Sequence, residues 1–78
     1  MKRLEVLKTI EEVASLPTGS LKGDEQLSTL FGWDSLSGVV FRAAVKDRWR
    51  VALSGVALAR CETVADIVKS LGSHVEDR

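Results

Sequence analysis

The stretch from residue 36 to 49 has helical periodicity, and it is apolar on two sides rather than one. The bulkier residues form one i, i+4, i+8 stripe: Phe41, Val45 and Trp49. Smaller residues form a second stripe on nearly the opposite side: Leu36, Val40 and Ala43. A few short helices cannot surround one of their number, so only one stripe is expected to enter the core. We predict that the bulkier stripe is buried and that the smaller one is a docking surface. The alternative is that a loop covers it.

Basic residues follow the same helix at i, i+4, i+8 spacing, as Arg42, Lys46 and Arg50, and Asp47 lies beside them. One interpretation is a solvated face whose charges are partly paired. The other is a basic rim that steers an acidic partner. Lys46 and Asp47 are therefore candidate partner contacts, together with the smaller apolar stripe.

The rest of the chain also indicates helices. Near the N-terminus, apolar residues at helical spacing predict an amphipathic helix of about four turns: Leu4, Leu7, Ile10 and Val13. Pro17 is expected to end this helix, because the residue before a proline is disfavoured in helical geometry. No regular period follows until Trp33. A loop of this length is usually functional or disordered.

The loop carries apolar residues that need burial: Leu21, Leu27, Leu30, Phe31 and Trp33. We therefore expect an ordered loop packed over the helices, with a short helical turn near Glu25–Thr29. Trp33 is expected to fix the loop by packing.

The last third of the chain shows two helix starts. Ser54 can cap a short helix over Gly55–Arg60, and Thr63 with Asp66 forms a capping-box-like pair. Four residues give the final helix its apolar stripe: Val64, Ile67, Val68 and Leu71. Gly72 is placed to end that helix, and the polar tail Ser73–Arg78 is expected to fray. The fold class predicted is all-α, with three main helices and one short helix in a single domain over residues 1–78.

Length and composition exclude several functions. The chain has 78 residues, 11 basic and 11 acidic, so no net field favours nucleic acid or an anionic membrane. Cys61 is the only cysteine, which excludes an internal disulfide and a cysteine-based zinc site, and we expect it to be a small buried side chain. Early charged residues exclude a signal peptide, and no run is long enough to span a membrane. We expect a monomeric cytoplasmic domain. It has no cluster of catalytic or metal-ligating residues, and hence is not an enzyme.

The run Gly32-Trp33-Asp34-Ser35-Leu36 resembles the Asp-Ser-Leu attachment motif of acyl carrier proteins and peptidyl carrier domains. The resemblance extends beyond the motif to loop anchors, to helix hydrophobics and to the start of the last helix: Leu27, Phe31, Val39, Phe41, Val45, Trp49, Val51, Leu53 and residues 62–67. It therefore covers most of the chain.

The resemblance implies a role for each motif residue. Ser35 would be joined to phosphopantetheine by a phosphopantetheinyl transferase, and the terminal thiol of this cofactor would carry acyl or aminoacyl groups as thioesters. Asp34 would contact the transferase and its metal, and Leu36 would pack against acyl-loading and acyl-processing enzymes. Taken by themselves, Asp34 and Ser35 are also good helix N-caps. The alternative function is therefore an unmodified helical protein-interaction module with a carrier-like fold.

The chain departs from the family on the second helix. Carriers of fatty-acid synthesis are acidic there, whereas this chain has basic residues: Arg42, Lys46, Arg48 and Arg50. Gly38 inside the helix costs up to about 1 kcal/mol relative to alanine, and we interpret it as space for the arm or its acyl chain. These departures indicate a carrier in a specialised lipid, polyketide or secondary-metabolite pathway. A helix-turn-helix DNA-binding domain is a weaker interpretation, because no base-reading set of side chains accompanies the basic row.

Overall fold

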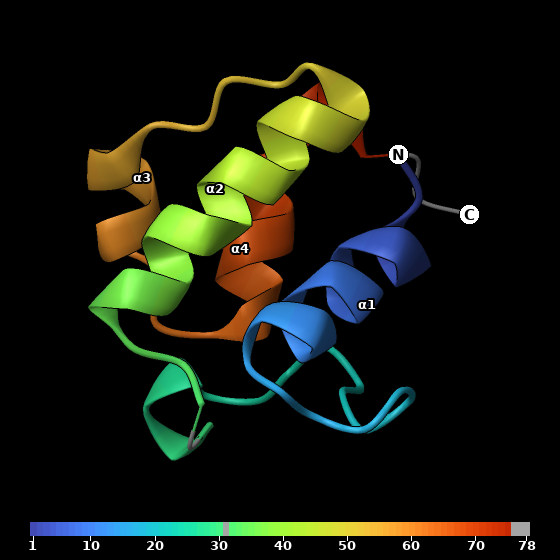
Figure 1. Cartoon of the computed structure of the whole chain (residues 1–78), viewed down its shortest axis with the longest axis vertical. Helices are drawn as coiled ribbons and strands as arrows, with labels where there is room; N and C mark the ends of the chain where they lie inside the picture. Colours follow the sequence, from blue (N-terminus) through green and yellow to red (C-terminus); the bar gives the residue numbers. More distant parts are fainter. Residues whose placement is uncertain (31, 76–78) are drawn as a thin grey trace.

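The computed structural model describes residues 1–30 and 32–75, and it confirms the all-α class. The elements in chain order are α1 (Arg3–Val13), the 3-10 turn η1 (Leu27–Thr29), α2 (Ser35–Trp49), α3 (Gly55–Ala59), α4 (Val64–Ser70) and the 3-10 turn η2 (Gly72–His74). Three helices are substantial and α3 is short, as predicted. Figure 1 shows the long α1–α2 loop crossing one end of the bundle.

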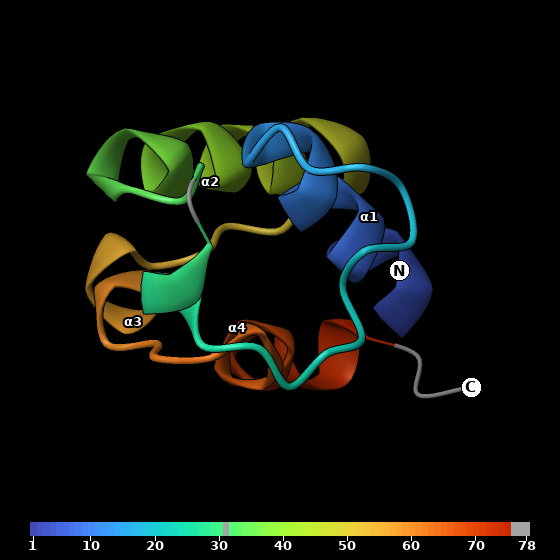
Figure 2. The same cartoon turned by 90° about the horizontal axis from the view of Figure 1, so that it is seen from below.

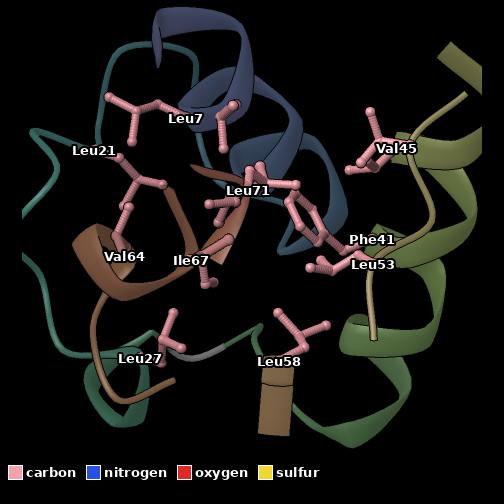
Figure 3. Packing of buried hydrophobic residues seen from close by; sticks show 13 residues of the cluster. Leu7, Leu21, Leu27, Phe41, Val45, Leu53, Leu58, Val64, Ile67 and Leu71 are labelled. Atoms are coloured by element: carbon pink, nitrogen blue, oxygen red, sulfur yellow. The ribbon is translucent and has the colours of Figure 1, made fainter. Parts of the chain in front are cut away.

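The four helices pack in a closed cycle, in which α1 contacts α2 and α4, and α3 contacts the same two helices. Figure 2 shows α2 on one side of the bundle, α3 and α4 on the other, and α1 closing one end. The side chains that fill the centre come from every helix and from the loop. Figure 3 shows Leu7, Phe41, Leu58 and Ile67 turned toward this common centre. One connected core therefore holds all the elements.

The structure divides the two stripes of α2 as the sequence predicts. Phe41 and Val45 are fully buried, and Trp49 is partly buried against the core. On the other side, Leu36 is 69% exposed and Val40 is 47% exposed. The alternative in which the loop covers the smaller stripe is therefore wrong.

Helix α1 differs from the prediction in length and in the face that it buries. It spans 11 residues, about three turns, and ends before Pro17 in a Schellman motif. In this motif Ser15 adopts a positive φ of 59° and the Leu16 N–H donates to the Glu11 carbonyl at 2.8 Å. Leu4 is 73% exposed, whereas Val6 is fully buried. The packing of α2 and α4 selects this face, which is rotated from the predicted stripe.

The loop between α1 and α2 is ordered, as expected from its apolar residues. Leu21 and Leu27 are buried in the core, and Leu30 and Trp33 pack against it. Phe31, also predicted to be buried, lies outside the described residues. The side chain of buried Glu11 accepts a hydrogen bond from the Leu21 N–H at 2.9 Å, which holds the loop to α1.

A second contact fixes the loop to the start of α4. Gln26 and Thr63 form an antiparallel bridge. On either side of it the Leu27 N–H donates to the Glu62 carbonyl at 2.8 Å, and the Val64 N–H donates to the Glu25 carbonyl at 2.9 Å. The predicted helical turn is present as η1, directly after this bridge. The loop is therefore held by main-chain hydrogen bonds as well as by apolar packing.

The predicted starts of α3 and α4 are confirmed. The Ser54 side chain accepts from the Ala57 N–H, and Thr63 with Asp66 forms a reciprocal capping box. The prediction of a frayed tail is wrong for residues 73–75. Gly72–His74 form the 3-10 turn η2 after α4, and the amino group of Met1 donates to the His74 carbonyl at 3.0 Å. Residues 76–78 of the predicted tail lie outside the described part.

Two valines on α2 test the division between core and surface. Val45→Ala should lower the free energy of unfolding by about 2 kcal/mol, because it removes buried methyl groups and leaves a cavity. Val40→Ala removes the same atoms from the exposed side and should change the free energy of unfolding by less than about 0.5 kcal/mol. Urea unfolding at equilibrium measures both. Equal losses for the two variants would contradict the assignment.

Candidate functional site at the start of α2

Asp34 caps α2 and places Ser35 in its first turn. The Asp34 carboxylate accepts from the Ser37 N–H at 2.9 Å, and the Asp34 N–H donates to the Ser37 hydroxyl at 3.2 Å. The Ser37 hydroxyl in turn donates to the Gly32 carbonyl at 2.7 Å. Asp34 is therefore the N-cap and Ser35 is the first helical residue, so the capping function does not require Ser35.

Gly32 brings the motif close to the end of α1. A Cβ atom at this position would collide with the main-chain carbonyl of Ala14, so a side chain larger than hydrogen cannot fit there without moving the backbone. The start of α2 is thus anchored against α1 by a close backbone approach.

The Ser35 side chain is free. It is exposed, and its hydroxyl forms no hydrogen bond with the part of the chain that the structure describes. Ser37, two residues later, is buried and fully engaged in the capping box. The N-terminal turn of a helix offers N–H groups and a positive dipole end, which stabilise an attached anion such as a phosphate.

A pocket of about 410 Å³ lies beside Ser35. It is bounded by α2, α3 and the loop, and its lining includes Leu27, Trp33, Gly38, Val39, Leu58, Ala59 and Cys61. Gly38 opens this pocket toward the helix axis, since a Cβ there would meet only the Leu58 side chain, at 3.4 Å. Asp34 and Arg42 add charged groups to this lining, and the volume and the mixed lining suit the flexible arm or a short acyl group.

Trp33 both fixes the loop and lines the pocket. Its ring meets Phe41 edge to face, with ring centroids 5.8 Å apart and planes inclined by 66°. Because Phe41 is fully buried, this contact connects the attachment motif directly to the core.

Two ionisable groups at the site have shifted pKa values. The Ser37 N–H, and after it the Ser37 hydroxyl, hold the pKa of Asp34 below its ordinary value. Asp34 therefore remains a carboxylate near neutral pH. Burial raises the pKa of the Cys61 thiol, which also donates to the Ala57 carbonyl at 3.4 Å. Cys61 is partly rather than fully buried, and the raised pKa favours its protonated thiol over the more nucleophilic thiolate.

The predicted partner contacts form an exposed face on α2. Asp34, Leu36, Val40, Ala43, Lys46 and Asp47 are all exposed. Val39, which is 57% exposed, belongs to this face as well, although the sequence analysis did not place it there. Val39 lies three residues after Leu36, and this spacing places both residues on the same face of a helix. The pocket residues from α3 and η1 carried no such signal, because only the tertiary fold brings them to Ser35.

Metal sites and membrane-spanning helices are two further features that the described residues could contain. Within residues 1–30 and 32–75, no three His, Cys, Asp or Glu side chains gather in a way that could hold a metal ion. None of the helices in the same range has both the length and the apolar character needed to cross a membrane.

Comparison with protein-family models gives one match, to the family described as "Phosphopantetheine attachment site", over residues 5–71. The match covers most of the chain, from the first turn of α1 to beyond the end of α4. No curated protein and no solved structure matched the chain.

The capping geometry predicts a pH effect on stability. Asp34 has a lowered pKa in the folded state, so its contribution is present above the unfolded value of 3.8 and is lost as the pH falls through the folded value. We expect the free energy of unfolding of the wild type, relative to Asp34→Asn, to decrease when the pH drops from about 5 to below 3.8. Urea titrations across this pH range measure the difference in free energy of unfolding between the wild type and Asp34→Asn. The other acidic groups contribute equally to both proteins, so their effects cancel in this difference. A difference independent of pH would contradict the hydrogen-bonding assignment.

Proposed function

Because the chain belongs to the phosphopantetheine attachment site family, it is a carrier protein of the phosphopantetheine-dependent type, and we propose that Ser35 bears the arm. The family carries this prosthetic group covalently. We further propose that residues 1–78 constitute a single carrier domain with no catalytic residues of its own. The observation that carries the proposal is the exposed Ser35 hydroxyl in the first turn of α2, within the matched region, which forms no hydrogen bond with residues 1–30 and 32–75.

The residues around Ser35 fit the attached group. Phosphopantetheine supplies a terminal thiol that holds acyl or aminoacyl groups as thioesters. Ser35 presents its hydroxyl oxygen for the phosphodiester bond, and the first turn of α2 stabilises the negative charge next to it. Asp34 keeps its carboxylate ionised and exposed, which supports a role in contacting the transferase and its metal.

The pocket beside Ser35 supports a sheltering role. Gly38 leaves open a space that a larger side chain would occupy, and Trp33 and Leu58 supply apolar walls. A thioester held there would meet less water than one exposed on the surface.

The exposed face of α2 supports docking by enzymes that act on the arm. Leu36, Val40 and Ala43 would contact the phosphopantetheinyl transferase and the acyl-loading and acyl-processing enzymes, while Asp34, Lys46 and Asp47 would flank them. The basic residues of α2 favour a dedicated, specialised pathway. We propose that the carrier acts as a cytoplasmic monomer.

Modification by a transferase tests Ser35 directly. Wild-type protein incubated with coenzyme A and a promiscuous phosphopantetheinyl transferase should gain the mass of one phosphopantetheine, measured on the intact chain. Ser35→Ala should gain none. Ser28→Ala should be modified like the wild type, because Ser28 is an exposed serine that lines the same pocket. A wild-type chain left unmodified by several transferases would instead favour the alternative function, an unmodified interaction module.

Gly38 tests the sheltering role of the pocket. Gly38→Leu should fill the space next to Leu58 and expose an octanoyl group carried on the arm. We expect the thioester of the loaded variant to react with hydroxylamine several-fold faster than that of the loaded wild type. Gly38→Ala is the matched control, since its Cβ makes only a contact at the van der Waals limit and should leave the rate nearly unchanged. Equal rates in all three proteins would exclude sheltering while leaving attachment at Ser35 intact.

A further inference from the structure

We propose that the partners of this carrier dock with an acidic surface, and that one partner carboxylate binds between Arg42 and Lys46 on α2. The proposal rests on the proposed function, since it concerns the proteins that act on the arm at Ser35. The proposal gives these partner proteins a negative charge at the position that faces Arg42 and Lys46.

The binding place is a groove of about 280 Å³ along the side of α2. It is formed by α2 and the segment between α2 and α3, and its lining is Val39, Arg42, Ala43, Lys46, Ala52 and Leu53. Two of these six residues are cationic and none is anionic. A groove with an apolar floor and two cations accepts the side chain of a glutamate or an aspartate: the methylene groups lie on the floor, and the carboxylate lies between the charges.

Arg42 is held in position between this groove and the pocket beside Ser35, both of which it lines. Its Nε–H donates to the Leu53 carbonyl at 2.9 Å, and its guanidinium lies against Gly55, where a Cβ would come within 2.9 Å of Nη1. The terminal nitrogens of Arg42 have no acceptor within the described residues. Since the side chain is fixed before a partner arrives, less conformational entropy is lost when a carboxylate binds.

The other charges on α2 leave the groove cationic. Arg48 points away from it, toward α1, where it forms an ion pair with Glu12 at 2.7 Å. That is the only ion pair within residues 1–30 and 32–75. Asp47 is exposed and follows Lys46 in sequence, but it does not line the groove. Arg50 adds a further exposed cation at the end of the helix.

The apolar surroundings favour a protein partner over a membrane. Leu36, Val39 and Val40 are exposed on the same helix, which gives a partner an apolar contact next to the charged groove. Peripheral binding to anionic lipids commonly uses a cluster of about four to eight basic residues, whereas this groove holds two and the whole chain has no net charge. A single acidic side chain on an apolar protein surface matches the groove better.

The test measures binding without chemistry. The probes are two phosphopantetheinyl transferases, one with an acidic and one with a basic surface beside its active site, and the carrier is the 78-residue chain with Ser35→Ala. We expect tighter binding to the acidic-faced enzyme, and an affinity for it that falls as salt rises. Adding Arg42→Glu and Lys46→Glu should weaken this binding roughly tenfold and strengthen binding to the basic-faced enzyme.

The matched control carries the same change of charge elsewhere. Lys8→Glu with Lys22→Glu places two reversals on α1 and the following loop, outside the groove, and should leave both affinities within about twofold of the parent. Circular dichroism and urea unfolding establish that each variant is folded. Equal effects of the two double variants would mean that only net charge matters, and this would overturn the proposal.

Two other outcomes would also overturn it. One is that the acidic-faced enzyme binds no more tightly than the basic-faced one. The other is binding to phosphatidylserine vesicles that the Arg42→Glu and Lys46→Glu changes abolish, together with no preference between the enzymes; this would assign the groove to a membrane surface. Failure of the proposed function is separate from both, because it is the absence of arm transfer to the wild-type Ser35 hydroxyl.

Discussion

The main-chain contact between the α1–α2 loop and the start of α4 is the constraint on which the candidate site depends. In the loop, Gln26 pairs with Thr63, and the next residue, Leu27, is buried in the core. Ordering a long loop costs conformational entropy, and this contact offsets that cost together with the burial of Leu21 and Leu27. The bridge holds Gln26 against Thr63, and the edge-to-face contact of Trp33 with Phe41 attaches the start of α2 to the core.

Helix α2 has one buried side and one exposed side because the bundle is small. Phe41 and Val45 fill the centre among side chains from every other helix, and within residues 1–30 and 32–75 the opposite side of α2 stays exposed. That side therefore remains available to partners, and the basic groove lies next to it. Under the proposed function, attachment at Ser35 and docking along α2 share one helix, so a docked partner would have a fixed position relative to the arm.

Local chemistry made much of the fold predictable. The starts of α2, α3 and α4 followed from Asp34, Ser54 and Thr63, because N-caps depend on neighbours only a few residues away. The prediction was wrong where distant packing decides. Leu4 has helical spacing but faces solvent, and Gly72–His74 form a 3-10 turn whose His74 carbonyl accepts from the Met1 amino group. Neither result could follow from local periodicity, which specifies a face but not its partner.

The sequence by itself determined the all-α class, the main helix starts, the division of α2 into a buried and an exposed stripe, and the serine motif, since each depends on residue types at short spacing. Tertiary structure alone decided the rest. It placed Leu58 of α3, Cys61 just after α3 and Leu27 of η1 around a pocket next to Ser35. It also fixed Arg42 on the Leu53 carbonyl and turned Arg48 away to Glu12. These contacts join residues far apart in the chain, and only the packing of the helices brings them together.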